Sequence, residues 1–281
     1  QSICSQAREK TRAKRAATQG FSFFTLRAAA FVNCAALVIA CVFLFVNGIG
    51  ALDIEFVLDS PREMMTSGGV FPCLVGTFLL AAGAIAIALP FGVACAVWLN
   101  EYGKQGPVVD IVRLSVANLA GVPSIVFGLF GLAFFVTALG FNVSLLSGIL
   151  TLAVLTLPVI INTTEEALKQ VPRSWRDASL ALGATKSQTI GRIVLPSALP
   201  GILTGAILAV ARAAGETSAV MFTAAVFYTP KLPESVWSSV MALPYHMYVL
   251  ATAGTEIEKT RPMQYGTGLL LVVLVFAMNL I

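Results

Sequence analysis

Charged side chains are scarce in this sequence. Asp, Glu, Lys and Arg make up 11% of its 281 residues, whereas 57% of the residues are hydrophobic. A soluble globular domain carries about 25% charged residues, so the composition excludes that class and indicates a polytopic membrane protein. The formal net charge of +4 comes from clusters between apolar runs, without the motifs or basic stripe that mark a nucleic-acid-binding surface. Nucleic acid is therefore not an expected partner.

Metal-binding and catalytic signatures are missing as well. The chain has one histidine, His246, and five cysteines that form no CxxC pair, which excludes a zinc site of the usual ligand spacing. We expect His246 to be an ordinary residue at the membrane interface. The chain has no GxxxxGK[ST], so ATP and Mg²⁺ are not expected to bind to it. It has no GxSxG or HExxH either, which leaves an intramembrane enzyme without a catalytic motif. We expect no cofactor and no enzymatic activity.

Long apolar runs are abundant. A helix needs roughly 20 apolar residues to cross about 30 Å of hydrocarbon. Six windows meet this length: 27–47, 70–98, 112–139, 144–164, 197–228 and 263–281. Several contain a proline, which predicts kinked or interrupted helices. Most of the 18 lysines and arginines fall in segments that place both termini in the cytoplasm. The expected fold is an all-α, multi-pass protein of the cell membrane with six transmembrane helices.

The segments between these windows complete the predicted organisation. Residues 1–26 are a basic cytoplasmic segment, 27–69 hold the first helix and an outer loop, and 70–281 form a core of five helices. In the outer loop, "PESVWSSVMAL" places apolar residues such as Trp237 and Met241 at helical spacing, which predicts a short interfacial helix. A channel or an ion-driven transporter is an alternative class, but transporters of that kind often have duplicated halves, and no repeat relates 1–140 to 141–281.

The cytoplasmic segment 165–196 has the pattern of two short helices with a break between them. Pro172 suits the first turn of a helix, and Gly183 suits a left-handed stop after it. Thr185 and Gln188 have the spacing of a capping box that starts the next helix. The pattern alone favours a connector that lies against the bundle.

A family resemblance gives this segment a function. Asp177-Ala178-Ser179, Gly183, Ile193 and Leu195-Pro196 match the EAA-x3-G-x9-I-x-LP signature at every spacing, with Asp for Glu and Ser for the second Ala. The segment thus resembles the coupling loop of ATP-binding-cassette importer permeases and implies their type I fold. In that family the coupling helices seat in a cleft of the ATPase subunit. The contacts implied here are Trp175, Arg176, Asp177, Ala178, Ser179 and Gly183.

Four further stretches are similar to the permeases of the phosphate-specific transport system (PstA-type). They are "WLNEYG" at 98–103, "GVPSIVFGLFGL" at 121–132, "LPVIINTTEEAL" at 157–168 and "ARAAGETSAVMFTA" at 211–224. This resemblance implies import of inorganic phosphate by alternating access. It also implies a second permease (PstC-type), two ATPase subunits (PstB-type) that bind ATP and Mg²⁺, and a phosphate-binding protein outside the membrane (PstS-type). A permease for another oxyanion, sulfate or molybdate, is the alternative.

Two charges stand inside the fifth apolar window. Arg212 and Glu216 are four residues apart, so on one helix they would share a face and could pair. One interpretation is a structural ion pair. The other is an anion pathway, since a guanidinium is well matched to an oxyanion and Glu216 could accept the proton that phosphate carries and sulfate lacks. The predicted pathway residues are Arg212, Glu216, Thr217, Asn162, Thr163 and Thr164, and Asn162 stands where the PstA-type pattern commonly has Arg.

Overall fold

The computed structural model describes residues 2–65, 67–103, 106–253 and 257–280, without the side chains of 2–18, 20–22, 64 and 257–259. The basic residues of the predicted segment 1–26 and Lys104 therefore lie outside the described side chains. The helices are α1 (Ser2–Gly48), α2 (Ile54–Leu58), α3 (Phe71–Val97), α4 (Pro107–Ala120), α5 (Ser124–Gly131), α6 (Leu145–Gln170), α7 (Arg173–Ala181), α8 (Lys186–Thr189), α9 (Leu195–Ala214), α10 (Ser218–Thr223), α11 (Leu243–Thr252) and α12 (Ile257–Leu280). One small hairpin pairs β1 (Pro61–Arg62) with β2 (Ser67–Gly68).

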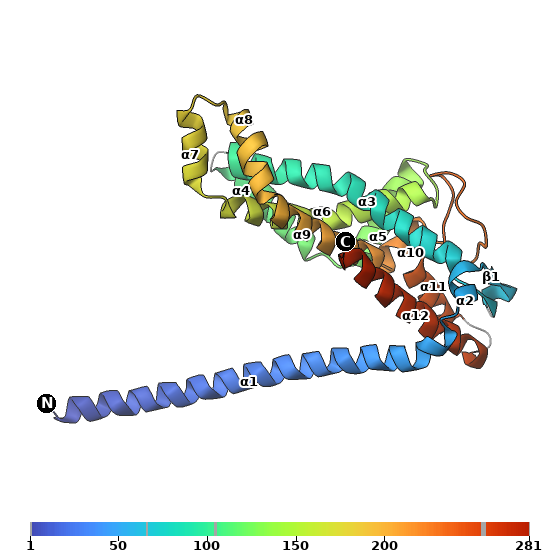
Figure 1. Cartoon of the computed structure of the whole chain (residues 1–281), viewed down its shortest axis with the longest axis horizontal. Coiled ribbons are helices and arrows are strands. Elements are labelled where there is room, and N and C mark those ends of the chain that lie inside the picture. The colour runs from blue at the N-terminus through green and yellow to red at the C-terminus, as the bar shows by residue number, and fades with distance from the viewer. Residues whose placement is uncertain (1, 66, 104–105, 254–256, 281) are drawn as a thin grey trace.

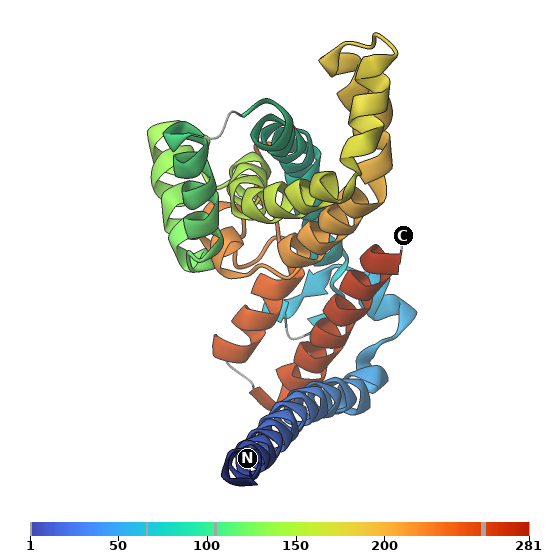
Figure 2. The same cartoon turned by 90° about the vertical axis from the view of Figure 1, so that its left-hand side faces the viewer.

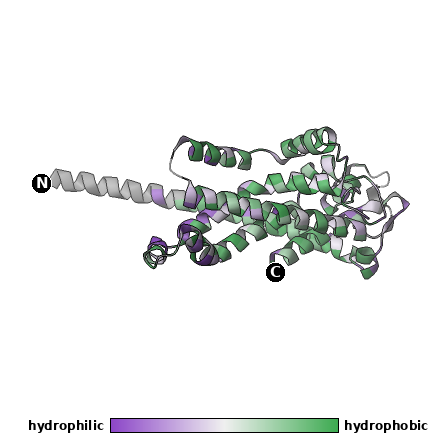
Figure 3. Cartoon of the chain, turned by 90° about the horizontal axis from the view of Figure 1, so that it is seen from above, coloured by the Kyte–Doolittle hydropathy of each residue, from purple (hydrophilic) through white to green (hydrophobic). Residues whose placement is uncertain are grey.

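The bundle is built around α6. The apolar part of α6 is 61% buried, whereas that of the helix from Phe23 to Ala51 is 0% buried. Close approach of α6 to α3 depends on small residues, because a Cβ on Gly92 would meet the side chain of Ile160 at 2.6 Å. Figure 3 shows hydrophobic residues along the helices and hydrophilic residues gathered at the two ends of the bundle. Among the described residues, five helices are long and apolar enough to cross a membrane, and the bent pair Pro107–Ala120 and Ser124–Ala138 makes six if it forms one span.

The chain ends agree with the predicted topology. Figures 1 and 2 show α1 at the edge of the bundle, next to α12. The N-terminal end of α1 points to the same end of the molecule as α7 and α8, and α12 runs back toward that end (Figure 1). The hairpin and α2 lie at the opposite end.

The third predicted span is interrupted. Its two halves, α4 and α5, are bent by 102° at a break that includes Gly121 and Pro123. Proline disfavours helical backbone in the residue before it, which explains why α4 ends ahead of Pro123 and α5 begins after it. The expectation of an interrupted helix in this window is confirmed.

The predicted fifth span, 197–228, is wrong in its extent. The helix α9 ends at Ala214, and Gly215 follows as its C-terminal cap. The apolar residues after the break form the short helix α10, which packs on α5 and α6, so that Ala219 and Val220 are buried in the central core. Their hydrophobicity reflects burial in protein and not a crossing of lipid.

The outer loop also differs from the prediction. Residues 233–241 form turns and extended backbone, so the interfacial helix predicted there is wrong. The carbonyl groups of Val236 and Ser238 instead accept hydrogen bonds from the first N–H groups of α6, those of Leu146 and Leu145, at 2.9 and 2.8 Å. The segment caps a spanning helix, and this use of its carbonyls competes with a helix of its own.

The only histidine of the sequence is buried and does not lie at an interface. His246 belongs to α11, a helix the sequence did not predict, and its exposed fraction is 1%. Neither ring nitrogen has a hydrogen-bond partner among the described residues. Burial lowers the pKa of His246 from 6.5 to about 4, because the charged form loses its hydration.

We expect the fold to lose stability in mild acid because of His246. Between pH 6.5 and 4 the unfolded chain binds a proton at this residue and the folded chain does not. The loss reaches about 2 kcal/mol at pH 5 and is absent above pH 7. Thermal unfolding of the purified chain at pH 7.5 and at pH 5 measures it, with His246→Leu as the comparison. An equal acid effect in both proteins would contradict this assignment.

Candidate functional site

The coupling segment forms the two-helix unit that its turn residues predict. Pro172 is the N-cap of α7, and Gly183 ends the unit's first half with a left-handed φ of +82°. The N–H of Gly183 donates to the carbonyl of Leu180 at 3.0 Å. The capping box of Thr185 and Gln188 is present at the start of α8. We call residues 173–189 the coupling unit; it protrudes at one end of the bundle (Figure 1).

One hydroxyl pair joins the two helices of the coupling unit. Ser179 of α7 and Thr189 of α8 lie 2.8 Å apart through their side-chain oxygens, and both residues are buried. Ser179 is the position at which the sequence departs from Ala in the family signature. The hydroxyl at this position therefore has a local structural role.

Ser179→Ala is expected to weaken the coupling unit slightly. The hydroxyl of Thr189 would stay buried without its partner, at a cost of about 1 kcal/mol. The double variant Ser179→Ala/Thr189→Val removes both hydroxyls and should recover most of this loss. Thermal unfolding of the three proteins tests the prediction, and a double variant less stable than Ser179→Ala would contradict it.

The other predicted coupling residues divide into two sets. Trp175, Asp177 and Ala178 are exposed on α7, as a docking face requires. The side chain of Arg176 is only 17% exposed and turns inward, where it forms an ion pair of 2.7 Å with Glu101. Arg176 therefore contacts this chain itself, which the sequence did not suggest.

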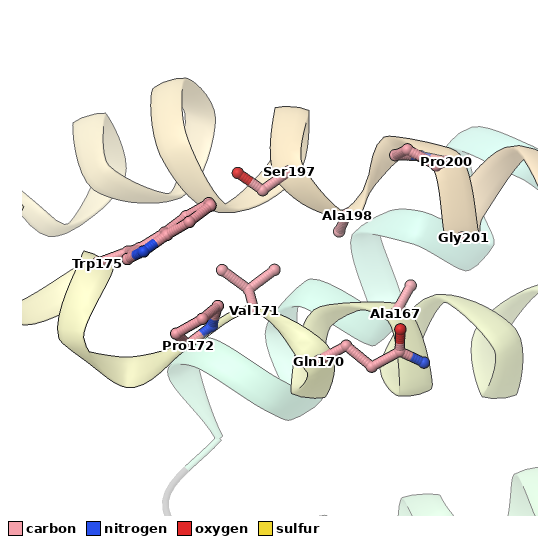
Figure 4. A pocket seen from close by; sticks show the side chains of 9 residues that line it. All are labelled: Ala167, Gln170, Val171, Pro172, Trp175, Ser197, Ala198, Pro200 and Gly201. Atoms are coloured by element: carbon pink, nitrogen blue, oxygen red, sulfur yellow. The ribbon is translucent and has the colours of Figure 1, made fainter.

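A hollow separates part of α7 from α9. Its volume is about 370 Å³, and Trp175, Pro172 and Val171 line one side of it while Ser197 and Gly201 line the other. Figure 4 shows the Trp175 ring at one end of this hollow and the α9 backbone at Gly201 at the far end. The coupling unit is thus not packed continuously against the bundle on this side.

The two charges of the fifth window do not form the expected pair. Arg212 lies in the last turn of α9, whereas Glu216 follows the end of that helix. No ion pair joins them among the described residues. Arg212 is exposed on this chain, and a cation is favourable at the C-terminal end of a helix. Glu216 is partly buried and accepts a hydrogen bond of 3.2 Å from the N–H of Ser218.

The remaining predicted pathway residues are distributed over two regions. Thr217 directly precedes α10, beside Glu216. Asn162 is exposed on α6, while the hydroxyl of Thr163 donates to the carbonyl of Val159 at 2.8 Å. Thr164 is fully buried, and its hydroxyl has no hydrogen-bond partner among the described residues.

The two regions lie at different depths in the bundle. Thr163 contacts Gly205 of α9, and Arg212 comes seven residues later on that helix. At the helical rise this separation is roughly 10 Å along the axis. A route past both regions would therefore meet them in succession.

A second set of charges was not predicted from the sequence. Glu165 of α6 is 9% exposed and pairs with Arg113 at 2.8 Å and with Lys169 at 2.9 Å. Glu101, in the stretch "WLNEYG", is equally buried beside Arg176. The spacing of Glu165 and Lys169 was the available signal, because acidic and basic residues four apart pair on a helix; the other pairs join distant segments.

Comparisons with known proteins agree with this geometry. The family described as "Binding-protein-dependent transport system inner membrane component" matches residues 88–281. The chain is 33% identical over 267 residues to the probable ABC transporter permease protein YqgI of Bacillus subtilis (strain 168), covering 89% of this chain and 90% of the relative. It is 40% identical over 221 residues to the phosphate transport system permease protein PstA of Mycobacterium leprae (strain TN), covering 78% and 70%.

A solved structure supports the same fold. Inward-facing conformations of the MetNI methionine ABC transporter match with a TM-score of 0.55 and 25% identity, over 75% of this chain and 90% of that one. The type I importer fold, with five to six membrane spans among the described residues, and the multi-pass membrane location are thereby confirmed. The chain belongs to the family of binding-protein-dependent transport system inner membrane components, the permeases of ABC importers.

Proposed function

We propose that this chain is a permease subunit of an ATP-driven importer that moves inorganic phosphate across the cytoplasmic membrane by alternating access. The observation that carries the proposal is the identity of this chain, 40% over 221 residues, to a permease named for phosphate transport. Of the four stretches that resemble PstA-type permeases, 98–103 lies beside the coupling unit, 157–168 contains Asn162, Thr163 and Thr164, and 211–224 contains Arg212. The fourth, 121–132, includes α5, which packs on α10.

The proposed complex has parts that this chain does not supply. A second permease (PstC-type) completes the membrane pathway, and two ATPase subunits (PstB-type) bind ATP and Mg²⁺ and hydrolyse the nucleotide. A phosphate-binding protein (PstS-type) delivers the anion from outside. In this proposal the present chain has no catalytic site and no cofactor of its own. The exposed residues Trp175, Asp177 and Ala178 meet the ATPase.

Arg212 is the proposed anion contact in the pathway. Its guanidinium is permanently charged and offers forked donors to an oxyanion. Exposure of a charged side chain to lipid is costly, so the exposure of Arg212 on the surface of α9 favours an aqueous route over lipid. Glu216 and Thr217, at the break after α9, and Asn162, Thr163 and Thr164 complete the proposed route.

Reconstitution tests the proposed function. The complete complex in proteoliposomes with internal ATP should accumulate labelled phosphate only when the binding protein is outside. Excess unlabelled phosphate should abolish uptake, whereas sulfate and molybdate should not. Accumulation of labelled sulfate or molybdate with no phosphate uptake would replace phosphate by that anion, and uptake driven by an ion gradient without ATP would overturn the importer assignment.

A further inference from the structure

The end of α3 lies against both helices of the coupling unit. Beyond Val97 the helix continues as a π-helical segment, η3 (Trp98–Tyr102), which is the conspicuous "WLNEY" of the sequence. A hydrogen bond of 2.7 Å from the N–H of Gly103 to the carbonyl of Trp98 closes this segment. Single π-helical turns are frequent at functional sites.

Glu101 of η3 holds Arg176 of α7 through a forked contact. Nη2 of Arg176 lies 2.7 Å from Oε1 of Glu101, and Nε lies 3.2 Å from the same oxygen. Both side chains are less than one-fifth exposed. The amide of Asn100 donates to the same carboxylate at 2.9 Å, which fixes its orientation. Charge-assisted, forked and buried contacts of this kind are strong and geometrically specific.

The same guanidinium also binds the end of α6. Nη1 of Arg176 donates to the carbonyl of Val171 at 2.6 Å, and Nη2 donates to that of Leu168 at 2.9 Å. One side chain of the coupling unit therefore joins the last turns of two spanning helices. Val171 lines the hollow beside α9, and a second hollow of about 270 Å³ is lined by Val171, Glu101 and Arg176. The polar contacts of Arg176 therefore attach the coupling unit where packing is incomplete.

A second contact links η3 to α8. The ammonium group of Lys186, the first residue of α8, lies 4.9 Å from the centre of the Tyr102 ring. This cation–π contact is exposed, so it is weaker than the contact of Glu101. Together the two contacts hold both halves of the coupling unit to adjacent residues of η3.

We propose that η3 is a third element of the coupling device, in which Glu101, assisted by Tyr102, clamps the coupling unit to α3 and α6. Displacement of the coupling unit by the ATPase then moves α3 and α6 as one body with it. Glu101 and Arg176 are positioning residues in this inference, and they act through the helices they join. The inference rests on the proposed function, since it requires an ATPase at the coupling unit.

Glu101→Gln in the complete complex is the first test. The amide keeps the shape of the carboxylate and removes its charge. The ATPase should still co-purify and hydrolyse ATP, while phosphate uptake per ATP should fall at least about fivefold, because a buried charge loses its partner. Glu101→Asp should restore part of the uptake. Asp110→Asn is the matched control, because Asp110 is an exposed carboxylate of α4 with no ion pair among the described residues.

Tyr102 provides a variant that disturbs no buried charge. Tyr102→Phe retains the ring and should behave as wild type, whereas Tyr102→Leu should lower uptake per ATP by about twofold, the effect of losing an exposed cation–π contact. Equal uptake per ATP in Glu101→Gln, Tyr102→Leu and wild type would overturn the clamp.

A distance measurement tests the clamp independently of which anion the complex transports. Spin labels at Phe91 of α3 and Leu182 of the coupling unit, which are 67% and 89% exposed, report whether the two parts move together. In the wild-type complex the distance distribution should be the same without nucleotide and after vanadate trapping, and Glu101→Gln should make the two states differ. A distance that changes between the states already in the wild type would overturn the clamp. If the complex fails to transport phosphate, the proposed substrate is wrong, and this measurement still decides the inference.

Discussion

Arg212→Ala is expected to lower phosphate uptake by the complete complex about 10-fold to 100-fold, the loss that corresponds to one charge-assisted hydrogen bond of about 1.5–3 kcal/mol. The side chain of Arg212 has no hydrogen bond or ion pair among the described residues. Its removal should therefore leave folding and assembly with the ATPase intact. Uptake of labelled phosphate and co-purification of the ATPase measure the two effects.

Arg212→Lys is the matched control for this prediction. Lysine keeps the positive charge and loses the forked geometry, so its uptake should lie between that of wild type and that of Arg212→Ala. Glu216→Gln tests whether Glu216 accepts the proton that phosphate carries. If it does, the variant should discriminate less well between phosphate and sulfate. Wild-type uptake in Arg212→Ala would remove Arg212 from the pathway.

Gly183→Pro is expected to uncouple ATP hydrolysis from transport. Proline requires a φ near −65°, whereas residue 183 has +82°, and proline also lacks the N–H that binds Leu180. The break between α7 and α8 would be rebuilt, so force from the ATPase would be lost in a deformable loop. Phosphate uptake should fall at least about 10-fold while ATP hydrolysis continues, a loss that corresponds to more than about 1.4 kcal/mol in the transport barrier.

Two further glycine variants isolate the backbone effect. Gly183→Ala meets no atom within 4 Å but retains the unfavourable left-handed φ, so its uptake should be intermediate. Gly191→Ala, in the following helical turn, also meets open space and has no positive φ, so it should behave as wild type. Normal uptake per ATP in Gly183→Pro would show that the geometry of this break is not needed for coupling.

Local turn chemistry explains which parts of the fold the sequence could predict. Pro172, Gly183 and Thr185 act on their immediate neighbours, so the coupling unit was readable from spacing alone. The end of α9 was not predicted, because the apolar run resumes at Ala219, four residues after Gly215, and so resembles the continuation of one span. Hydrophobicity does not distinguish burial against lipid from burial against α5 and α6.

The contacts between distant segments could not be predicted from the sequence. Glu101 and Arg176 are 75 residues apart, and nothing in their spacing links them. Arg212 and Glu216 show the reverse case. Their spacing predicts a pair on one helix, but the helix ends at Gly215, between the two residues. His246 was predicted at an interface from its residue type, whereas it is buried in α11, a helix that packs against α12.

The exposed face of α9 around Arg212 is proposed to border an aqueous anion route. Leu208, one turn before Arg212, is 54% exposed on this face, and a cysteine placed there reports its surroundings. In a complete complex whose five native cysteines in this chain are replaced by alanine, Leu208→Cys should react with a membrane-impermeant anionic thiosulfonate, at a rate that changes on vanadate trapping and falls when phosphate is added. Leu37→Cys, on the outward surface of α1, should react only with lipid-soluble reagents. Reaction of Leu208→Cys with lipid-soluble reagents alone, unaffected by nucleotide or phosphate, would contradict the account.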